Sequence, residues 1–163
     1  MIIDKMNPDD WTEVKGIYCE GNADGNATFQ TEAPSWVEWD RSHDNECRLV
    51  ARIDGELKGW AALSPVSNRR VYAGVAEVSV YVSHKWSGKG LGSLLLSALV
   101  DLSENRDIWT LQSGIFPENT ASLFIHKKCG FREVGKRERI GKMNGVWRDT
   151  ILLERRSQLV GID

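Results

Sequence analysis

The chain has 163 residues, of which 41% are hydrophobic and 27% are charged, and its formal net charge at pH 7 is -2. This length supports one globular domain with a substantial core and is too short for two ordinary domains. Because the charges nearly balance, the chain has no general attraction to nucleic acid or to an anionic membrane. An anionic ligand would need a local binding site, so the composition favours a small-molecule partner.

The cysteines Cys19, Cys47 and Cys129 are far apart and form no C-x-x-C pair, which argues against a disulfide framework and against a zinc site. No metal is therefore expected. The first residues lack the apolar stretch of a signal peptide, and the longest apolar run is far below the ~18 residues that span a bilayer. We expect a cytoplasmic protein with reduced thiols and no membrane association.

The first third of the chain predicts two helices around a long loop. Residues 7–10 resemble a helix start, because an asparagine cap precedes a proline and two acids. The helix should end near Gly21, and its apolar face comprises Trp11, Val14, Ile17 and Tyr18. Residues 21–35 are rich in glycine, asparagine, threonine and proline, so we expect a functional loop there, followed by a short helix after Pro34.

Three strands follow. Residues 48–53 and 57–63 alternate apolar and polar side chains around Asp54-Gly55, which predicts a hairpin. A third strand is predicted over residues 75–82, with opposite faces formed by Val78, Val80 and Val82 and by Glu77, Ser79 and Tyr81.

The remainder predicts two more helices and three more strands. The first helix carries an apolar stripe of Leu91, Leu94, Leu95, Ala98, Leu99 and Leu102. A strand over 108–116 precedes a helix that begins at Asn119 and stops at Gly130, and two closing strands flank Asn144-Gly145. The order β-α-α-β-β-β-α-β-α-β-β, with no repeat or linker, indicates an α+β sheet covered by helices.

The segment between the third strand and the leucine-rich helix, residues 86–93, has the sequence WSGKGLGS. Glycines that open a helix allow backbone N–H groups to approach an anion at the positive end of the helix dipole, so this turn suits a phosphate. Its spacing fits neither the P-loop nor the dinucleotide-binding fingerprint. The alternative is a glycine-rich helix entry that binds nothing.

Other candidate residues lie on the elements around this turn. Asn119 and His126 share one face of their predicted helix, although alone they indicate a helix cap and a packed histidine. Glu77 interrupts an apolar strand, where a buried carboxylate needs a partner; alternatively it is a solvated acid on the polar face. Arg69, Arg70 and Tyr72 either clamp an oxyanion or are solvated loop residues.

Taken together, these segments resemble the GNAT superfamily of N-acetyltransferases, and in particular its phosphinothricin N-acetyltransferase branch. The resemblance rests on residues 27–32, 76–83, 119–131 and 145–149. It implies one domain over residues 1–156, built on a single mixed, mostly antiparallel central sheet flanked by helices, with a C-terminal tail at 157–163. It also implies a homodimer.

The resemblance implies acetyl-CoA as the cosubstrate. Main-chain groups of Val80, Tyr81 and Val82 would pair with the pantetheine arm and the acetyl carbonyl, and Asn119 would hydrogen-bond the CoA. The residues that would wrap the pyrophosphate are Gly88, Lys89, Gly90, Leu91, Gly92 and Ser93. Ser87 stands where the family usually has glutamine or arginine, which should weaken CoA binding modestly, because most of the donors are backbone N–H groups.

The resemblance also implies the chemistry and the acceptor. Glu77 would act as general base, directly or through water, because an ammonium group must lose a proton before it attacks a thioester. His126 would serve as base, as acid or as a substrate ligand. The acceptor would be of the phosphinothricin, methionine sulfoximine or methionine sulfone type, with Arg69 as its carboxylate clamp. Its site would comprise Phe29, Ser67, Asn68, Arg69, Tyr72, Glu77, Val78 and Ser79.

Two alternatives remain. An acetyltransferase of the same fold could act on another amine, such as a protein N-terminus, a polyamine or an antibiotic. A non-catalytic acyl-CoA-binding module would keep the glycine turn without turnover, although the presence of both Glu77 and His126 argues against it.

Overall fold

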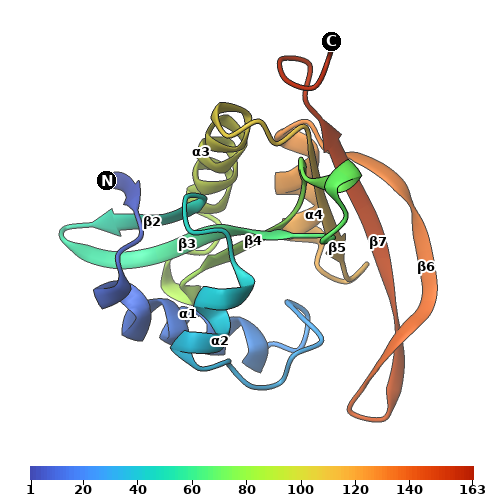
Figure 1. Ribbon diagram of the computed structural model, residues 1–163. Helices are drawn as coiled ribbons and strands as arrows, with labels where there is room; N and C mark the ends of the chain where they lie inside the picture. Colours follow the sequence, from blue (N-terminus) through green and yellow to red (C-terminus); the bar gives the residue numbers. More distant parts are fainter.

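A seven-stranded sheet forms the centre of the computed structural model, which describes residues 1–163 (Figure 1). The strands lie in the order β1-β2-β3-β4-β5-β7-β6, and all neighbours are antiparallel except β4 and β5. The strands are β1 (Ile2–Lys5), β2 (Arg48–Ile53), β3 (Glu56–Pro65), β4 (Val75–Val82), β5 (Thr110–Ile115), β6 (Arg132–Met143) and β7 (Val146–Arg156). The helices are α1 (Trp11–Ala23), α2 (Trp36–Ser42), α3 (Leu91–Asn105) and α4 (Thr120–Lys128). The predicted α+β class and element order are confirmed.

Both predicted hairpin turns form as the sequence indicates. Asp54 and Gly55 have φ angles of 52° and 81°, and Asn144 and Gly145 have φ angles of 49° and 80°. Two consecutive positive φ angles define a type I′ turn, whose twist matches that of the flanking strands. Local residue chemistry therefore accounts for the β2–β3 and β6–β7 hairpins.

The sheet carries a separate apolar core on each face, and Figure 1 shows α1 and α2 on one side and α3 on the other. Alternation along β3 supplies both cores. Trp60 and Ala62 pack in the cluster with α1 and α2. Ala61 and Leu63 pack in the cluster that contains the buried leucines of α3.

The apolar face of α3 is rotated from the predicted one. Leu91, Leu95 and Leu99 are buried as expected, but Leu94 is 44% exposed. Leu96 and Val100 are buried instead. The buried face of α3 therefore contains Leu91, Leu95 and Leu99 together with Leu96 and Val100, and not Leu94. The position of the helix on the sheet, and not the leucine stripe alone, determines which of its residues are buried.

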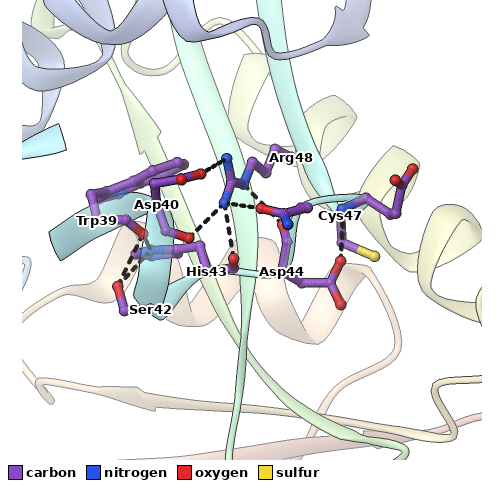
Figure 2. Close-up of polar contacts among 9 residues, drawn as sticks. Trp39, Asp40, Ser42, His43, Asp44, Cys47 and Arg48 are labelled. Carbon is purple, nitrogen blue, oxygen red and sulfur yellow. Dashed lines mark hydrogen bonds and ion pairs between the residues drawn. The ribbon is translucent and has the colours of Figure 1, made fainter. Parts of the chain in front are cut away.

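The connection between α2 and β2 is organised by Arg48, which is 6% exposed (Figure 2). Its guanidinium donates to the carbonyl oxygens of Asp40, His43 and Asp44 at 2.8–2.9 Å and pairs with the Asp40 carboxylate at 2.7 Å. The same group lies 5.0 Å from the centre of the Trp39 ring. A buried cation is tolerated here because its donors are satisfied by the chain.

The segments outside these elements include the predicted loop after α1, where residues 24–35 form neither helix nor strand. The tail, residues 157–163, curls beside β5: Ser157 donates its backbone N–H to the Trp109 carbonyl at 2.8 Å, and Arg156 donates to the Val160 carbonyl at 3.0 Å. No helix has the length and apolar character needed to cross a membrane.

Candidate active site

The central feature of the site is a divergence between β4 and β5. These parallel strands pair only at Val75–Glu77 with Thr110–Gln112, whereas β4 continues to Val82 with one edge bonded to β3. Beyond Glu77 the other edge of β4 therefore has no strand partner. A cavity of about 560 Å³ opens at this divergence, and its walls come from β4–β7, α4 and residues 27–30. This volume is in the range of small-molecule sites.

Glu77 lies where the two strands part, and its exposed side chain lines the cavity. Glu77 is therefore a solvated acid on the polar face of β4, as the alternative prediction held, and not a buried carboxylate. No ion pair in the structure involves Glu77. A carboxylate without an ion-pair partner in a cavity wall can accept a proton or a hydrogen bond from a cationic ligand.

His126 lies on α4 and is 3% exposed, with its ring packed edge-on against Phe131. Its Nδ1–H donates to the carbonyl of Ser122 at 2.8 Å, which fixes the tautomer and leaves Nε2 as an acceptor. Nε2 is buried and has no hydrogen-bond partner, although His126 lines the cavity. Burial lowers the pKa of His126, because the charged form loses hydration, so the ring is neutral near pH 7.

The glycine turn leads into α3 at the end of β4. Gly88 and Gly90 have φ angles of 75° and 85°, and a Cβ at either position would meet no atom within 4 Å. Glycine is thus required by the backbone conformation and not by crowding. Gly90 caps the 15-residue helix α3, whose first N–H groups and positive dipole end suit an anion. The Lys89 ammonium lies 4.5 Å from the centre of the Trp86 ring.

Asn119 has structural partners at both ends of its amide. Its Oδ1 accepts from the Ser122 N–H at 3.2 Å, which caps α4, and its Nδ2 donates to the Asn26 carbonyl at 3.2 Å. The side chain therefore joins the start of α4 to the loop after α1. Asn119 lines the cavity, and its predicted hydrogen bond to CoA would replace or share one of these contacts.

The loop after α1 covers part of the cavity through Phe29. This ring packs edge-on against Phe116, with ring centres 4.8 Å apart, and also lies against Gly141 of β6. A Cβ at position 141 would come within 2.7 Å of the Phe29 ring, so glycine permits this close approach. The predicted wall residue Phe29 is thereby brought into the cavity, and a hydrogen bond joins Gln30 to the Tyr18 hydroxyl.

Arg148 of β7 holds the same loop in place. Its guanidinium donates to the Gly25 carbonyl at 2.8 Å and to the Asn26 Oδ1 at 2.7 Å, and it pairs with Glu118 at 3.3 Å. It also lies 3.9 Å from the centre of the Phe116 ring. One side chain therefore connects the loop, the approach to α4 and an aromatic wall of the cavity.

The structure brings only some of the predicted residues together. Those that line the cavity are Phe29, Glu77, Val78, Ser79, Val80, Tyr81, Asn119 and His126. Val82 and the glycine turn lie outside its lining, at the end of β4. The predicted acceptor residues Ser67, Asn68, Arg69 and Tyr72 also lie outside it, in the exposed connection between β3 and β4. There the Arg69 guanidinium lies 5.7 Å from the centre of the Tyr72 ring, and the clamp role expected of Arg69 remains a prediction.

Sequence reasoning missed the wall formed by the last three strands. It comprises Gln112, Ser113, Gly114, Ile115, Arg137, Ile140, Gly141, Thr150 and Leu152. Period-two alternation marks one face of each strand, but only the pairing of distant strands shows which face meets the cavity. Arg137 in particular sits in a charged run, KRER, that is also typical of a solvated edge strand.

Comparisons with known proteins bear on the same elements. A model of the acetyltransferase (GNAT) family matches residues 11–131. A phosphinothricin N-acetyltransferase from Streptomyces coelicolor is 35% identical over 136 residues, which cover 78% of this chain and 80% of that protein. An L-methionine sulfoximine/L-methionine sulfone acetyltransferase from Pseudomonas aeruginosa is 31% identical over 100 residues, or 61% of this chain and 58% of that protein.

Solved structures agree with these matches. A phosphinothricin acetyltransferase from Sinorhizobium meliloti, crystallised in complex with acetyl-CoA, superposes with a TM-score of 0.88 at 26% identity. The superposition covers 99% of this chain and 91% of that one. The matched region of this chain includes β4 and α4, which both contribute to the cavity wall, and the glycine turn that leads from β4 into α3.

Proposed function

The chain belongs to the acetyltransferase (GNAT) family and is an N-acetyltransferase, and on this premise we propose that it acetylates the amine of a small amino-acid-like acceptor, with Glu77 as the general base. The observation that supports this proposal is the cavity at the divergence of β4 and β5. It combines an unpaired carboxylate, a buried imidazole acceptor and a free strand edge, and it lies beside a glycine-rich helix start.

The residues around the divergence fit acetyl-CoA, which supplies an electrophilic thioester carbonyl when bound. The free edge of β4 offers backbone groups at Val80, Tyr81 and Val82 to an extended arm. Alternate N–H groups along this edge can also stabilise the negative charge that develops on the carbonyl oxygen during attack. The turn from Gly88 to Ser93 opens α3, whose first N–H groups can donate hydrogen bonds to a pyrophosphate.

We assign the removal of the amine proton to Glu77. An acceptor that enters as an ammonium ion has no lone pair, so a base must take a proton before nitrogen can attack. The Glu77 side chain is exposed and lines the cavity, so its carboxylate can take this proton directly or through a water molecule. Its place at the parting of the strands puts it beside the free β4 edge.

We assign His126 an accepting role at the same amine. With Nδ1–H committed to Ser122, the neutral ring has no proton at Nε2 to give to a leaving thiolate. It can accept a hydrogen bond or a proton from the acceptor. Of the three roles predicted for this residue, those of base and substrate ligand therefore agree best with the geometry.

The charge of the cavity favours a small zwitterionic acceptor over a polycation. Glu77 is the only carboxylate among its lining residues, and Arg137 is the only arginine or lysine. A polyamine site would need several acidic groups, whereas an amino acid needs one group of each sign. Relatives that act on phosphinothricin or on methionine sulfoximine and sulfone support the same class.

The test of the proposed function is thiol release from acetyl-CoA by the purified chain with a panel of amines. We expect phosphinothricin, methionine sulfoximine or methionine sulfone to accelerate release more than spermidine or a peptide N-terminus does. Acceleration by spermidine or a peptide alone would reject the amino-acid acceptor. No acceleration by any amine, with acetyl-CoA still bound, would favour a non-catalytic binding module.

We further propose that the protein is a homodimer in the cytoplasm. The β6–β7 hairpin, which projects from the rest of the sheet in Figure 1, carries the exposed apolar residues Val134, Ile140, Val146 and Trp147. A second copy is a natural cover for such a surface. The three cysteines are free, as is usual in a reducing compartment. Analytical ultracentrifugation of wild type and Trp147→Glu tests the dimer.

A further inference from the structure

Strand register places Glu77 and Arg137 on the same face of the sheet. Glu77 pairs with Gln112, and Gln112 pairs with Glu154 of β7. Thr150 lies four residues from Glu154 along β7 and is paired with Arg137 of β6. Paired residues point to the same face and alternate residues along a strand share it, so these side chains all face the α1 side.

Both charged groups also line the cavity, but from opposite walls. Glu77 belongs to β4 and Arg137 to β6, and β5 and β7 lie between them. Three strand spacings correspond to about 14 Å in a regular sheet, and β4 and β5 diverge here. A ligand that reaches from one wall to the other would contact a carboxylate at one end and a guanidinium at the other.

Arg137 differs from every other cation of the β6–β7 hairpin because it has no partner. Ion pairs occupy Arg132, Lys136, Arg148 and Arg155, aromatic rings contact Arg139 and Lys142, and carbonyl oxygens accept from Arg156. None of the ion pairs or cation–π contacts includes Arg137. Arg137, which lines the cavity, is thus the one cation of the hairpin left without a partner.

A bulge in β6 immediately follows this residue. The β6–β7 register shifts between Arg137 and Gly141, and Arg139 has a φ angle of 49°. The Asp149 carboxylate holds this bulge by accepting from the Arg139 N–H at 2.7 Å. Bulges bend a strand and redirect its side chains, often next to active sites. Here Arg137, Ile140 and Gly141 all reach the cavity.

We infer that Arg137 is the residue that binds the anionic group of the acceptor, by charge-assisted hydrogen bonds, opposite the amine at Glu77. This inference rests on the proposed amino-acid acceptor and replaces the clamp predicted at Arg69. A guanidinium suits this task because its planar N–H groups match a carboxylate or a phosphinate and it stays charged. The anion is either the α-carboxylate or, in an acceptor such as phosphinothricin, the distal phosphinate.

The test compares KM values for acceptors that carry different anions. Phosphinothricin has a carboxylate and a phosphinate, methionine sulfone has the carboxylate alone, and methionine sulfone amide has neither. We expect Arg137→Met to raise the acceptor KM about 10- to 100-fold where the bound anion is present, with the amide KM within about twofold. The KM for acetyl-CoA should not change, and Arg137→Lys should restore part of the affinity.

Matched controls separate this role from a general loss of charge. Lys136→Met removes the neighbouring cation on the opposite face, and Arg69→Met removes the clamp predicted from sequence; neither should change the acceptor KM. An effect on both anionic acceptors supports binding of the carboxylate, and an effect on phosphinothricin alone supports binding of the phosphinate.

Two results would overturn the inference. Unchanged KM values in Arg137→Met, or equal increases for the amide and the anionic acceptors, would exclude Arg137 as the anion-binding residue while the proposed function stands. Failure of the wild type to acetylate any amino acid would reject the proposed function and the inference together. Comparison of wild type and variant therefore distinguishes the two failures.

Discussion

Charged side chains are paired in the region around Arg48 and unpaired in the cavity between β4 and β5. Arg48 is buried, and its guanidinium is bonded to three carbonyl oxygens and to the Asp40 carboxylate. In the cavity, Glu77 and Arg137 form no ion pair, and the buried Nε2 of His126 has no partner. Charges that the chain itself satisfies hold the fold together, whereas charges left unpaired in a cavity are available to a ligand.

The largest expected effect on stability comes from Arg48. Arg48→Met leaves buried carbonyl oxygens without donors and should lower the free energy of unfolding by about 3–5 kcal/mol. Because Arg48 is remote from the cavity lining, kcat should stay within about twofold at temperatures where the variant is folded. Urea denaturation measures the first value. Arg132→Met, which removes the ion pair between exposed Arg132 and half-buried Glu154, is the control and should cost less than about 1 kcal/mol. Equal losses in both variants would show that the buried contacts of Arg48 stabilise the fold no more than an exposed ion pair does.

Gly90→Val should have the next largest effect. Valine at a φ angle of 85° costs about 1–2 kcal/mol and disturbs the first N–H groups of α3. We expect CoA affinity to fall at least about tenfold, as measured by isothermal titration calorimetry, while circular dichroism shows a folded protein. Gly135→Val on β6, where a Cβ meets no atom and φ is not positive, serves as the control. Unchanged CoA affinity in Gly90→Val would remove the turn from the site.

Replacement of Arg148 should have a smaller effect, which is limited to the KM for the acceptor. Arg148→Met removes the bonds to Gly25 and Asn26, so the loop that carries Phe29 loses its anchor. We expect the acceptor KM to rise about threefold to tenfold, with hydrogen exchange faster in residues 24–30. Lys142→Met, whose cation contacts only exposed Trp147, should leave both unchanged. A larger change in the KM for acetyl-CoA than in that for the acceptor would contradict this assignment.

The smallest effect should be a pH dependence of stability shared by the two regions. Burial lowers the pKa of both His43, beside Arg48, and His126 below the ordinary 6.5. As pH falls below about 6.5, the unfolded chain therefore binds more protons than the folded chain does. The stability that these neutral histidines contribute is complete above about pH 6.5 and decreases below it. Thermal unfolding between pH 7.5 and 5.5 should show the decrease, and His43→Gln and His126→Gln should each reduce it. An unfolding midpoint that does not change with pH in this range would contradict the prediction that the two buried histidines make stability depend on pH.

The fold was largely predictable because its signals are local. The alternation of residues 75–82 and the Asp54-Gly55 and Asn144-Gly145 pairs each specify their own conformation. Leu94 shows the limit of such reasoning. A leucine stripe predicts that α3 is amphipathic, but the sheet beneath determines the rotation of the helix, and that contact joins residues far apart in sequence.

The site was predictable only where its residues lie on one element. The spacing of Asn119 and His126 along α4 indicated a shared cleft, and both line the cavity. Arg69 and Arg137 lie on different elements, and the sequence could not show which of them lines the cavity. Both are arginines in charged, exposed segments and look alike in sequence. What distinguishes them is the register of β5, β6 and β7 and the bulge after Arg137, neither of which the sequence near Arg137 reveals.

If acetyl transfer takes place in the β4–β5 cavity, it should depend on Glu77, and kcat of Glu77→Gln with the best acceptor of the panel measures this dependence. Glutamine keeps the size of the side chain but cannot take a proton, so we expect kcat to fall about 10²- to 10⁴-fold. Because Glu77 is exposed, the melting temperature and the affinity for acetyl-CoA should not change. A kcat within about twofold of wild type would place the chemistry outside this cavity.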